Sequence, residues 1–155
     1  MTEPPPAAAQ ALAEATAQAI WARDRAAQAL GIKIVSVAPG RALATMRVRS
    51  DMVNGLHICH GGLIFSLADT AFAYACNAYN RNTVAAACHI DFLNPAKEGE
   101  TLAAEAIERS LSGRTGVYDV TVSVGQRTIA LFRGKSRRIA GEVIASLEEA
   151  DHQAA

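Results

Sequence analysis

The segment Gly61–Tyr79, with the sequence GGLIFSLADTAFAYACNAY, decides the fold of this chain. Two glycines open it and nearly every later residue is apolar, so we predict a helix from Gly61 or Gly62 to about Tyr79. Because it is apolar almost all round, this helix should be buried rather than lying on a surface. Its one charged side chain, Asp69, needs either a partner or a chemical role, because burying an isolated carboxylate costs free energy.

Segments typical of strands lie on both sides of this helix. They cover residues 32–37, 41–49, 84–92, 101–112, 117–125 and 128–139. An N-terminal helix within Ala7–Leu30 precedes them and ends at the C-cap glycine Gly31. Short connections between successive strands imply an antiparallel sheet. The order of elements predicts an α+β fold in which the sheet wraps the buried helix.

The length of 155 residues predicts one domain. We expect a flexible N-terminal tail over residues 1–15, a folded domain over 16–141 and a C-terminal tail over 142–155. Half of the residues are hydrophobic, which is enough to build a core.

Composition also excludes several classes of partner. Fifteen basic residues balance fifteen acidic ones, so no overall charge draws the chain to nucleic acid or to a membrane. No signal peptide is visible, and Asp69 interrupts the longest apolar segment. The cysteines Cys59, Cys76 and Cys88 lack paired spacing and indicate free thiols of a cytoplasmic protein. A metal site is not expected, because the Cys-His pairs are adjacent rather than spaced for one ion.

Gly61 and Asp69 are the first candidates for chemistry. Backbone N–H groups at the start of a helix point outward, and a glycine lets a ligand oxygen approach closely, as an oxyanion site requires. Alternatively, the glycines only ease a tight turn and Asp69 has a structural partner. Asp69 lies eight residues after Gly61, about 12 Å along one helix. If both groups act on one substrate, two antiparallel helices from two subunits must supply them, which makes a dimer the smallest active unit.

Two side chains before the helix are further candidates. Asn54 could hold a water or a substrate oxygen, although Asn-Gly is usually a turn. His60 could polarise a carbonyl or orient the loop, although a single histidine is more often structural. His89 and Asp91 share a strand face and could form only a salt bridge.

The densest basic cluster is Arg133, Lys135, Arg137 and Arg138, around Gly134 and Ser136. It could be a solvated strand end protected by charge. Alternatively, it could hold phosphate groups such as those of coenzyme A. The segment Thr115-Gly116-Val117 follows a turn and could line the same groove.

Several motifs taken in order resemble the PaaI-type hotdog-fold acyl-CoA thioesterases of bacterial phenylacetate degradation. The resemblance runs from about Ala26 to Gly141, and it rests on Asn54-Gly55, on Cys59-His60-Gly61-Gly62, on Phe65–Asn77, on Ile90–Pro95, on Thr115–Asp119 and on Ala130–Ser136. It implies a hotdog fold, a homodimer usually paired into a homotetramer, and hydrolysis of phenylacetyl-CoA and its ring-hydroxylated relatives. Coenzyme A is then part of the substrate, not a cofactor.

The resemblance also assigns roles to residues. The carboxylate maps to Asp69, the oxyanion donor to Gly61, and the assisting groups to His60 and Asn54. The coenzyme A groove maps to Gly62, Thr83, Val84, Ala85, Thr115, Gly116, Val117, Arg133, Gly134, Lys135 and Ser136. Some relatives carry a serine in the strand after the helix, where this chain has Ala85-Ala86-Ala87, so that role is vacant or falls to Thr83.

An acyl-CoA thioesterase is therefore our hypothesis, with Asp69 acting as general base or as nucleophile. An enoyl-CoA hydratase on the same fold is the alternative enzyme. A non-catalytic acyl-CoA binding module is the alternative without chemistry, and in it Asp69 would be structural.

Overall fold

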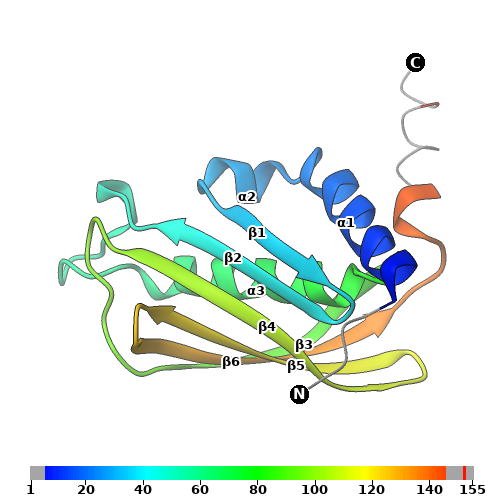
Figure 1. Cartoon of the computed structure of the whole chain (residues 1–155). Helices are drawn as coiled ribbons and strands as arrows, with labels where there is room; N and C mark the ends of the chain where they lie inside the picture. The colour runs from blue at the N-terminus through cyan, green and yellow to red at the C-terminus, as the bar shows by residue number, and fades with distance from the viewer. Residues whose placement is uncertain (1–5, 146–151, 153–155) are drawn as a thin grey trace.

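The computed structural model describes residues 6–145 and 152. One antiparallel sheet in the order β1-β2-β4-β5-β6-β3 curves around the helix α3 (Figure 1). The helices are α1 (Ala7–Trp21), α2 (Arg25–Ala29), the 3-10 turn η1 (Ser50–Met52) and α3 (Gly61–Asn77). The strands are β1 (Lys33–Ala38), β2 (Arg41–Arg47), β3 (Thr83–Phe92), β4 (Thr101–Ser112), β5 (Thr115–Val124) and β6 (Arg127–Arg138). The predicted α+β architecture, with an additional N-terminal helix, is confirmed.

The core lies between α3 and the concave face of the sheet. Alternate residues of the strands point inward, as period-two patterning requires. Phe72 of α3 packs between Tyr118 and Phe132, with ring centroids 5.5 and 5.8 Å apart. Gly134 of β6 lies against the same ring, and a Cβ there would come within 2.7 Å of it. The helix and the sheet approach each other closely at this point because β6 has no side chain there.

The prediction that α3 is buried all round is wrong for one of its faces. Ile64, Leu67, Ala71 and Ala75 are buried against the sheet. The other face repeats every three or four residues and is at least partly exposed; it contains Gly62, Phe65, Ser66, Asp69, Thr70, Ala73 and Asn77. A single sheet covers one side of a helix, so this face of α3 stays at least partly open to solvent in the described structure.

The N-terminal region differs from the expected tail and single helix. α1 begins at Ala7, so residues 7–15 are helical rather than a flexible tail, because Ala13 and Thr16 are buried and the Gln10 amide donates to the Val37 carbonyl at 2.8 Å. The helix also ends at Trp21, because Asp24 caps a second helix by accepting from the Ala27 N–H at 3.2 Å.

Parts of both predicted tails lie outside the described residues, so for those parts the tails remain predictions. Residues 1–5, 146–151 and 153–155 are not described. At the other end of the described region, the Ile144 N–H donates to the Asn80 side chain at 2.9 Å and Val143 is buried. No helix in the described region is long and apolar enough to cross a lipid bilayer.

The two edges of the sheet differ in their cover. Helix α1 packs against β1 at one edge. At the other edge, β3 pairs only with β6 among the residues that the structure describes, and most of its ten residues are exposed. Val84, Phe92 and the following Leu93 are large apolar residues near half exposure on or beside this strand. A long apolar edge strand is a template for pairing with another chain.

Candidate active site

The first turn of α3 presents an unused backbone donor. His60 caps the helix, and its Nδ1 accepts from the Gly62 N–H at 3.2 Å. The His60 carbonyl accepts from the N–H groups of Leu63 and Ile64 at 3.0 and 3.3 Å. In contrast to these three N–H groups, the Gly61 N–H has no acceptor among the described residues. The positive end of the helix dipole lies behind this free N–H, so the position suits a negatively charged oxygen.

His60 caps the start of α3 through its side chain and its backbone. Its ring nitrogen and its carbonyl both cap α3, and its own N–H donates to the Met52 carbonyl at 2.8 Å. The adjacent Cys59 N–H donates to the Ala96 carbonyl at 2.7 Å. These bonds fix the loop before Gly61, which supports the orienting role considered for His60.

Asp69 lies on the uncovered face of α3 without a partner. Its side chain is partly buried, and no hydrogen bond or ion pair to it exists among the residues that the structure describes. Burial raises the pKa of this carboxyl above its usual value, because desolvation disfavours the charged form. Its charge also contributes to the raised pKa values of the Cys76 and Cys88 thiols, although burial contributes more to both. Asp69 therefore faces the side of α3 that leads to β3.

The cost of this buried charge predicts a stability effect. Because the folded-state pKa of Asp69 is raised, its destabilising contribution is absent below the unfolded-state pKa and is complete once the pH exceeds the raised value. We expect Asp69→Asn to raise Tm at pH 7 and to leave it nearly unchanged at pH 3.5. Thermal denaturation of both proteins at the two pH values measures this, and an Asp69→Asn protein less stable at pH 7 would show that the carboxylate has a stabilising partner.

Gly61 and Asp69 are separated along one rigid element. Eight residues of helix span about 12 Å, too far for both groups to contact one reacting carbon. The ring of Phe92 from β3 also lies against Gly61, where a Cβ would come within 3.1 Å of it. If both groups act on one substrate, one chain alone cannot supply the complete site. Both groups lie on the side of α3 that faces β3.

Asn54 is placed in the loop that leads to α3. Its side-chain oxygen accepts from the Leu56 and Ile58 N–H groups at 2.9 and 3.3 Å, and its N–H donates to the Ile58 carbonyl at 2.8 Å. This is the turn geometry expected of Asn-Gly. The amide nitrogen of Asn54 has no acceptor among the described residues, so only that group is available to a water or a substrate.

Most of the residues predicted to contact coenzyme A come together on three neighbouring strands. Across β3 and β6, Thr83, Val84 and Ala85 pair with Arg138, Arg137 and Ser136. Across β5 and β6, Thr115, Gly116 and Val117 pair with Arg137, Ser136 and Lys135. Gly62 is separated from them, because it lies in the first turn of α3, whereas the Asn77 amide at the other end of α3 donates to the Thr83 carbonyl at 2.9 Å.

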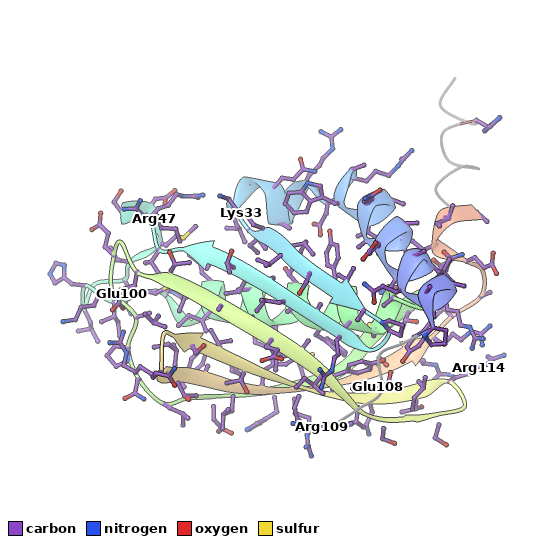
Figure 2. The ribbon with its side chains drawn as sticks, viewed as in Figure 1. Lys33, Arg47, Glu100, Glu108, Arg109 and Arg114 are labelled. Atoms are coloured by element: carbon purple, nitrogen blue, oxygen red, sulfur yellow. The ribbon has the colours of Figure 1, made fainter. Side chains whose placement is uncertain are left out.

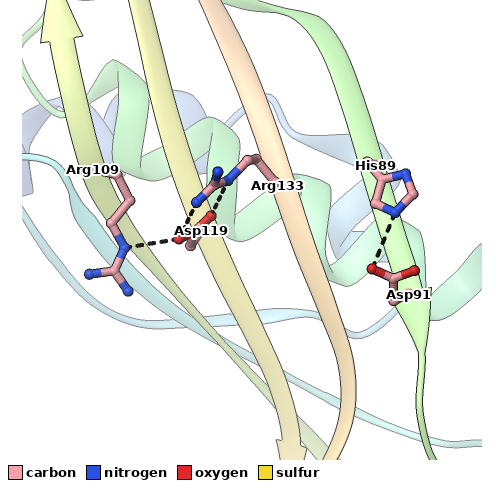
Figure 3. A network of polar contacts seen from close by, with 5 residues as sticks. All are labelled: His89, Asp91, Arg109, Asp119 and Arg133. Atoms are coloured by element: carbon pink, nitrogen blue, oxygen red, sulfur yellow. Dashed lines mark hydrogen bonds and ion pairs between the residues drawn. The ribbon is translucent and has the colours of Figure 1, made fainter.

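Arg133 lies on the outer face of the sheet, beside Arg109 and Asp119 (Figure 3). Its guanidinium donates to Asp119 at 2.6 and 2.9 Å, and Arg109 donates to the same carboxylate at 3.0 Å. The hydrogen bond from Arg133 holds the pKa of Asp119 below its usual range. On the same face, His89 and Asp91 form the expected pair at 3.2 Å. Arg133 already has a counterion, which weakens its interpretation as a phosphate ligand.

Three arginines that the sequence patterns did not single out together line one hollow. Arg81, Arg114 and Arg138 surround a volume of about 120 Å³ at the end of α3. They come from a loop, a hairpin and a strand end, so no local motif connects them. Among the described residues, no group of three or more His, Cys, Asp or Glu side chains is arranged to hold a metal ion.

Comparison with known proteins places this geometry in context. A family model described as the thioesterase superfamily matches residues 56–130. The acyl-coenzyme A thioesterase PaaI of Escherichia coli is 53% identical over 128 residues, which cover 82% of this chain and 91% of that protein. The solved structure of the E. coli PaaI protein from the phenylacetic acid degradation operon superposes with a TM-score of 0.84 and 51% identity, over 86% of this chain and 97% of that one. A mutant of the phenylacetic acid degradation protein PaaI from Thermus thermophilus gives a TM-score of 0.73 and 38% identity, over 75% and 100% of the two chains.

Proposed function

The chain belongs to the thioesterase superfamily, and from this membership and the open half-sites of α3 we propose that it hydrolyses acyl-coenzyme A thioesters. Phenylacetyl-CoA and its ring-hydroxylated relatives are the proposed substrates, because a relative 53% identical to this chain is named PaaI and its operon is one of phenylacetic acid degradation. The observation that carries the proposal is the pair of unpartnered groups, the Gly61 N–H and the Asp69 carboxylate, on one incompletely covered helix.

In the proposed reaction, the Gly61 N–H donates to the thioester oxygen as negative charge develops there. Asp69 either takes a proton from the attacking water or attacks the carbon itself, forming an anhydride that water then hydrolyses. The carbon–sulfur bond breaks, coenzyme A leaves as the thiol and the acyl group leaves as the carboxylic acid. His60 holds the start of the helix in place, and the free Asn54 amide nitrogen is available to orient a water.

A second copy of the chain would complete the site. The exposed apolar edge of β3 and the uncovered face of α3 lie beside each other, so one two-fold contact could cover both. In that arrangement the two α3 helices run antiparallel, and Gly61 of each chain faces Asp69 of the other. We propose this homodimer as the active unit, and a homotetramer of two such dimers follows from the resemblance to the PaaI-type enzymes.

Mixing two inactive variants tests the shared site. Asp69→Asn and Gly61→Pro each damage a different half, so a mixed dimer contains one intact site and one doubly damaged site. Refolding equal amounts together should restore about a quarter of the wild-type activity, since half of the dimers are mixed and each has one good site. Asp69→Asn mixed with the double variant is the matched control and should stay inactive. Recovery equal to that control would show that each chain carries its own site.

Release of free thiol from a panel of aryl and aliphatic acyl-CoAs, followed with a thiol reagent, tests the function itself. The proposal expects rapid release with arylacetyl-CoAs. Hydration of an enoyl-CoA without thiol release would identify a hydratase, and tight binding without any turnover would identify a binding module. The three free cysteines support a reducing compartment, the cytoplasm, as the site of the reaction.

A further inference from the structure

A groove of about 570 Å³ lies between α1 and the free edge of β1. One wall comes from α1, between Gln10 and Trp21, and the other comes from β1, between Lys33 and Val37. Its volume is typical of a site for a small molecule. Among the described residues, β1 and β3 are the two edges of the sheet, so the groove is separate from the half-sites of α3 that face β3.

The two walls are tied together at one end of the groove. The Gln10 side-chain amide donates to the Val37 carbonyl and to the Glu14 carboxylate, both at 2.8 Å. Glu14 also lines the groove, so its carboxylate is already hydrogen-bonded there. The two elements run in opposite directions (Figure 1), so Trp21, which ends α1, and Lys33, which begins β1, lie toward the other end.

The floor of the groove is apolar and contains an aromatic ring. Ala17, Trp21, Ile34 and Val37 are partly buried and pack against the hydrophobic core. Each keeps some surface that a ligand could cover. An indole ring packs favourably against a second aromatic ring, in an offset or edge-on arrangement. The floor therefore suits a ligand with an aromatic ring.

The cation that lines the groove has no partner. Lys33 is exposed, and among the residues that the structure describes its ammonium group makes no hydrogen bond or ion pair. The Trp21 carbonyl does not use it, because that oxygen accepts from the Asp24 N–H at 3.3 Å and from the Gln28 amide at 2.6 Å. Figure 2 shows Lys33 and Arg114 toward opposite ends of the sheet. A carboxylate would complement this unpaired charge.

We propose that the groove between α1 and β1 binds an aromatic monocarboxylate, with the carboxylate on Lys33 and the ring against Trp21. The site goes beyond the proposed function, because it lies at the other edge of the sheet from the side that Asp69 faces. Its ligand belongs to the class of acid that hydrolysis of an arylacetyl-CoA would release. The side chains of Gln18 and Ser36 line the same groove without a partner among the described residues, so they can bond a ring hydroxyl.

Tryptophan fluorescence tests the proposal directly. Trp21 is the one tryptophan of the chain, so its emission reports on this groove rather than on the half-sites of α3. Titration with phenylacetate should change the emission and reach saturation. In Lys33→Gln the Kd should weaken about tenfold, as expected when one hydrogen bond between charged groups is lost. The matched control is Lys97→Gln, which removes an exposed lysine from the loop before β4 and should leave the Kd unchanged.

Two further ligands test the chemistry of recognition on the wild-type protein. Phenylacetamide keeps the ring but lacks the charge, so it should bind about tenfold more weakly than phenylacetate. It should also bind the wild-type and Lys33→Gln proteins equally. Cyclohexylacetate keeps the charge but lacks the aromatic ring, so its Kd should be about threefold or more weaker than that of phenylacetate.

Unchanged tryptophan emission, or equal phenylacetate affinity of the wild-type and Lys33→Gln proteins, would overturn the proposal while the thioesterase function stands. Light scattering examines whether the groove is instead a contact between copies of the chain. A lower mass for Lys33→Gln than for the wild type would show such a contact and would also overturn the ligand site. The titration needs no turnover, so a protein that releases no thiol from any acyl-CoA would refute the proposed function and leave this result to stand by itself.

Discussion

Replacing Asp69 with asparagine is expected to lower kcat by about 10²–10⁴-fold, the range over which a positioned acid or base contributes to catalysis. The amide has nearly the same shape as the carboxylate but can neither accept a proton from water nor attack the thioester carbon. Steady-state thiol release from phenylacetyl-CoA measures the loss. KM should change little, because the amide keeps the size and shape of the carboxylate.

The structure supplies a matched control for this experiment. Asp91→Asn removes an exposed carboxylate whose partner is His89, on the outer face of the sheet. It should keep nearly full activity. Circular dichroism and thermal denaturation check that both variants fold. Near-normal kcat in a folded Asp69→Asn protein would remove Asp69 from the reaction and favour the binding-module alternative.

Replacing Gly61 with proline is expected to lower kcat by about 10²–10³-fold, the usual cost of losing one oxyanion donor. A backbone N–H cannot be removed by an ordinary side-chain change, but proline removes it. The first position of a helix tolerates proline, since its N–H has no partner within the helix. His60 has φ −59° and ψ 130°, a conformation that a residue before proline readily adopts.

Gly61→Ala is the control that separates the loss of the N–H donor from the steric effect of an added Cβ. It adds the same Cβ, 3.1 Å from the exposed ring of Phe92, but keeps the N–H. A small loss in Gly61→Ala and a large loss in Gly61→Pro, at similar Tm, would identify the N–H as the functional group. Equal losses in the two variants would instead show that Gly61 matters only because it leaves room for Phe92 or for the substrate.

Patterns local in sequence predicted the fold well. Strand alternation and turn residues located all six strands, and the apolar segment after Gly61 located the central helix. Local patterns failed where a distant contact determined the outcome. The sequence predicts a flexible tail over residues 1–15, yet residues 7–15 are helical because α1 packs on β1 and α3. Asp24 breaks the predicted N-terminal helix, and its carboxylate also accepts from the Tyr74 hydroxyl at 3.1 Å, fifty residues away.

In the candidate site too, some features could be predicted from local sequence and others depended on distant contacts. Gly61 and Asp69 followed from the sequence, because a helix start and a lone carboxylate in an apolar helix are local features, and helix geometry alone separates them by about 12 Å. Which arginines are free did not follow from the sequence. Arg133 stood out in the basic cluster, whereas Arg81 and Arg114 stood alone in the chain. Only the packed strands pair Arg133 with Asp119 and bring Arg81, Arg114 and Arg138 to one recess.

The sequence by itself therefore determined the helix, the strands and the two candidate groups of the site, because propensity, periodicity and helical rise act between near neighbours. The tertiary structure decided which face of α3 is left uncovered, which edge of the sheet is open and which charges remain without a partner. Those properties depend on contacts between residues far apart in the chain, and the register of the sheet sets these contacts.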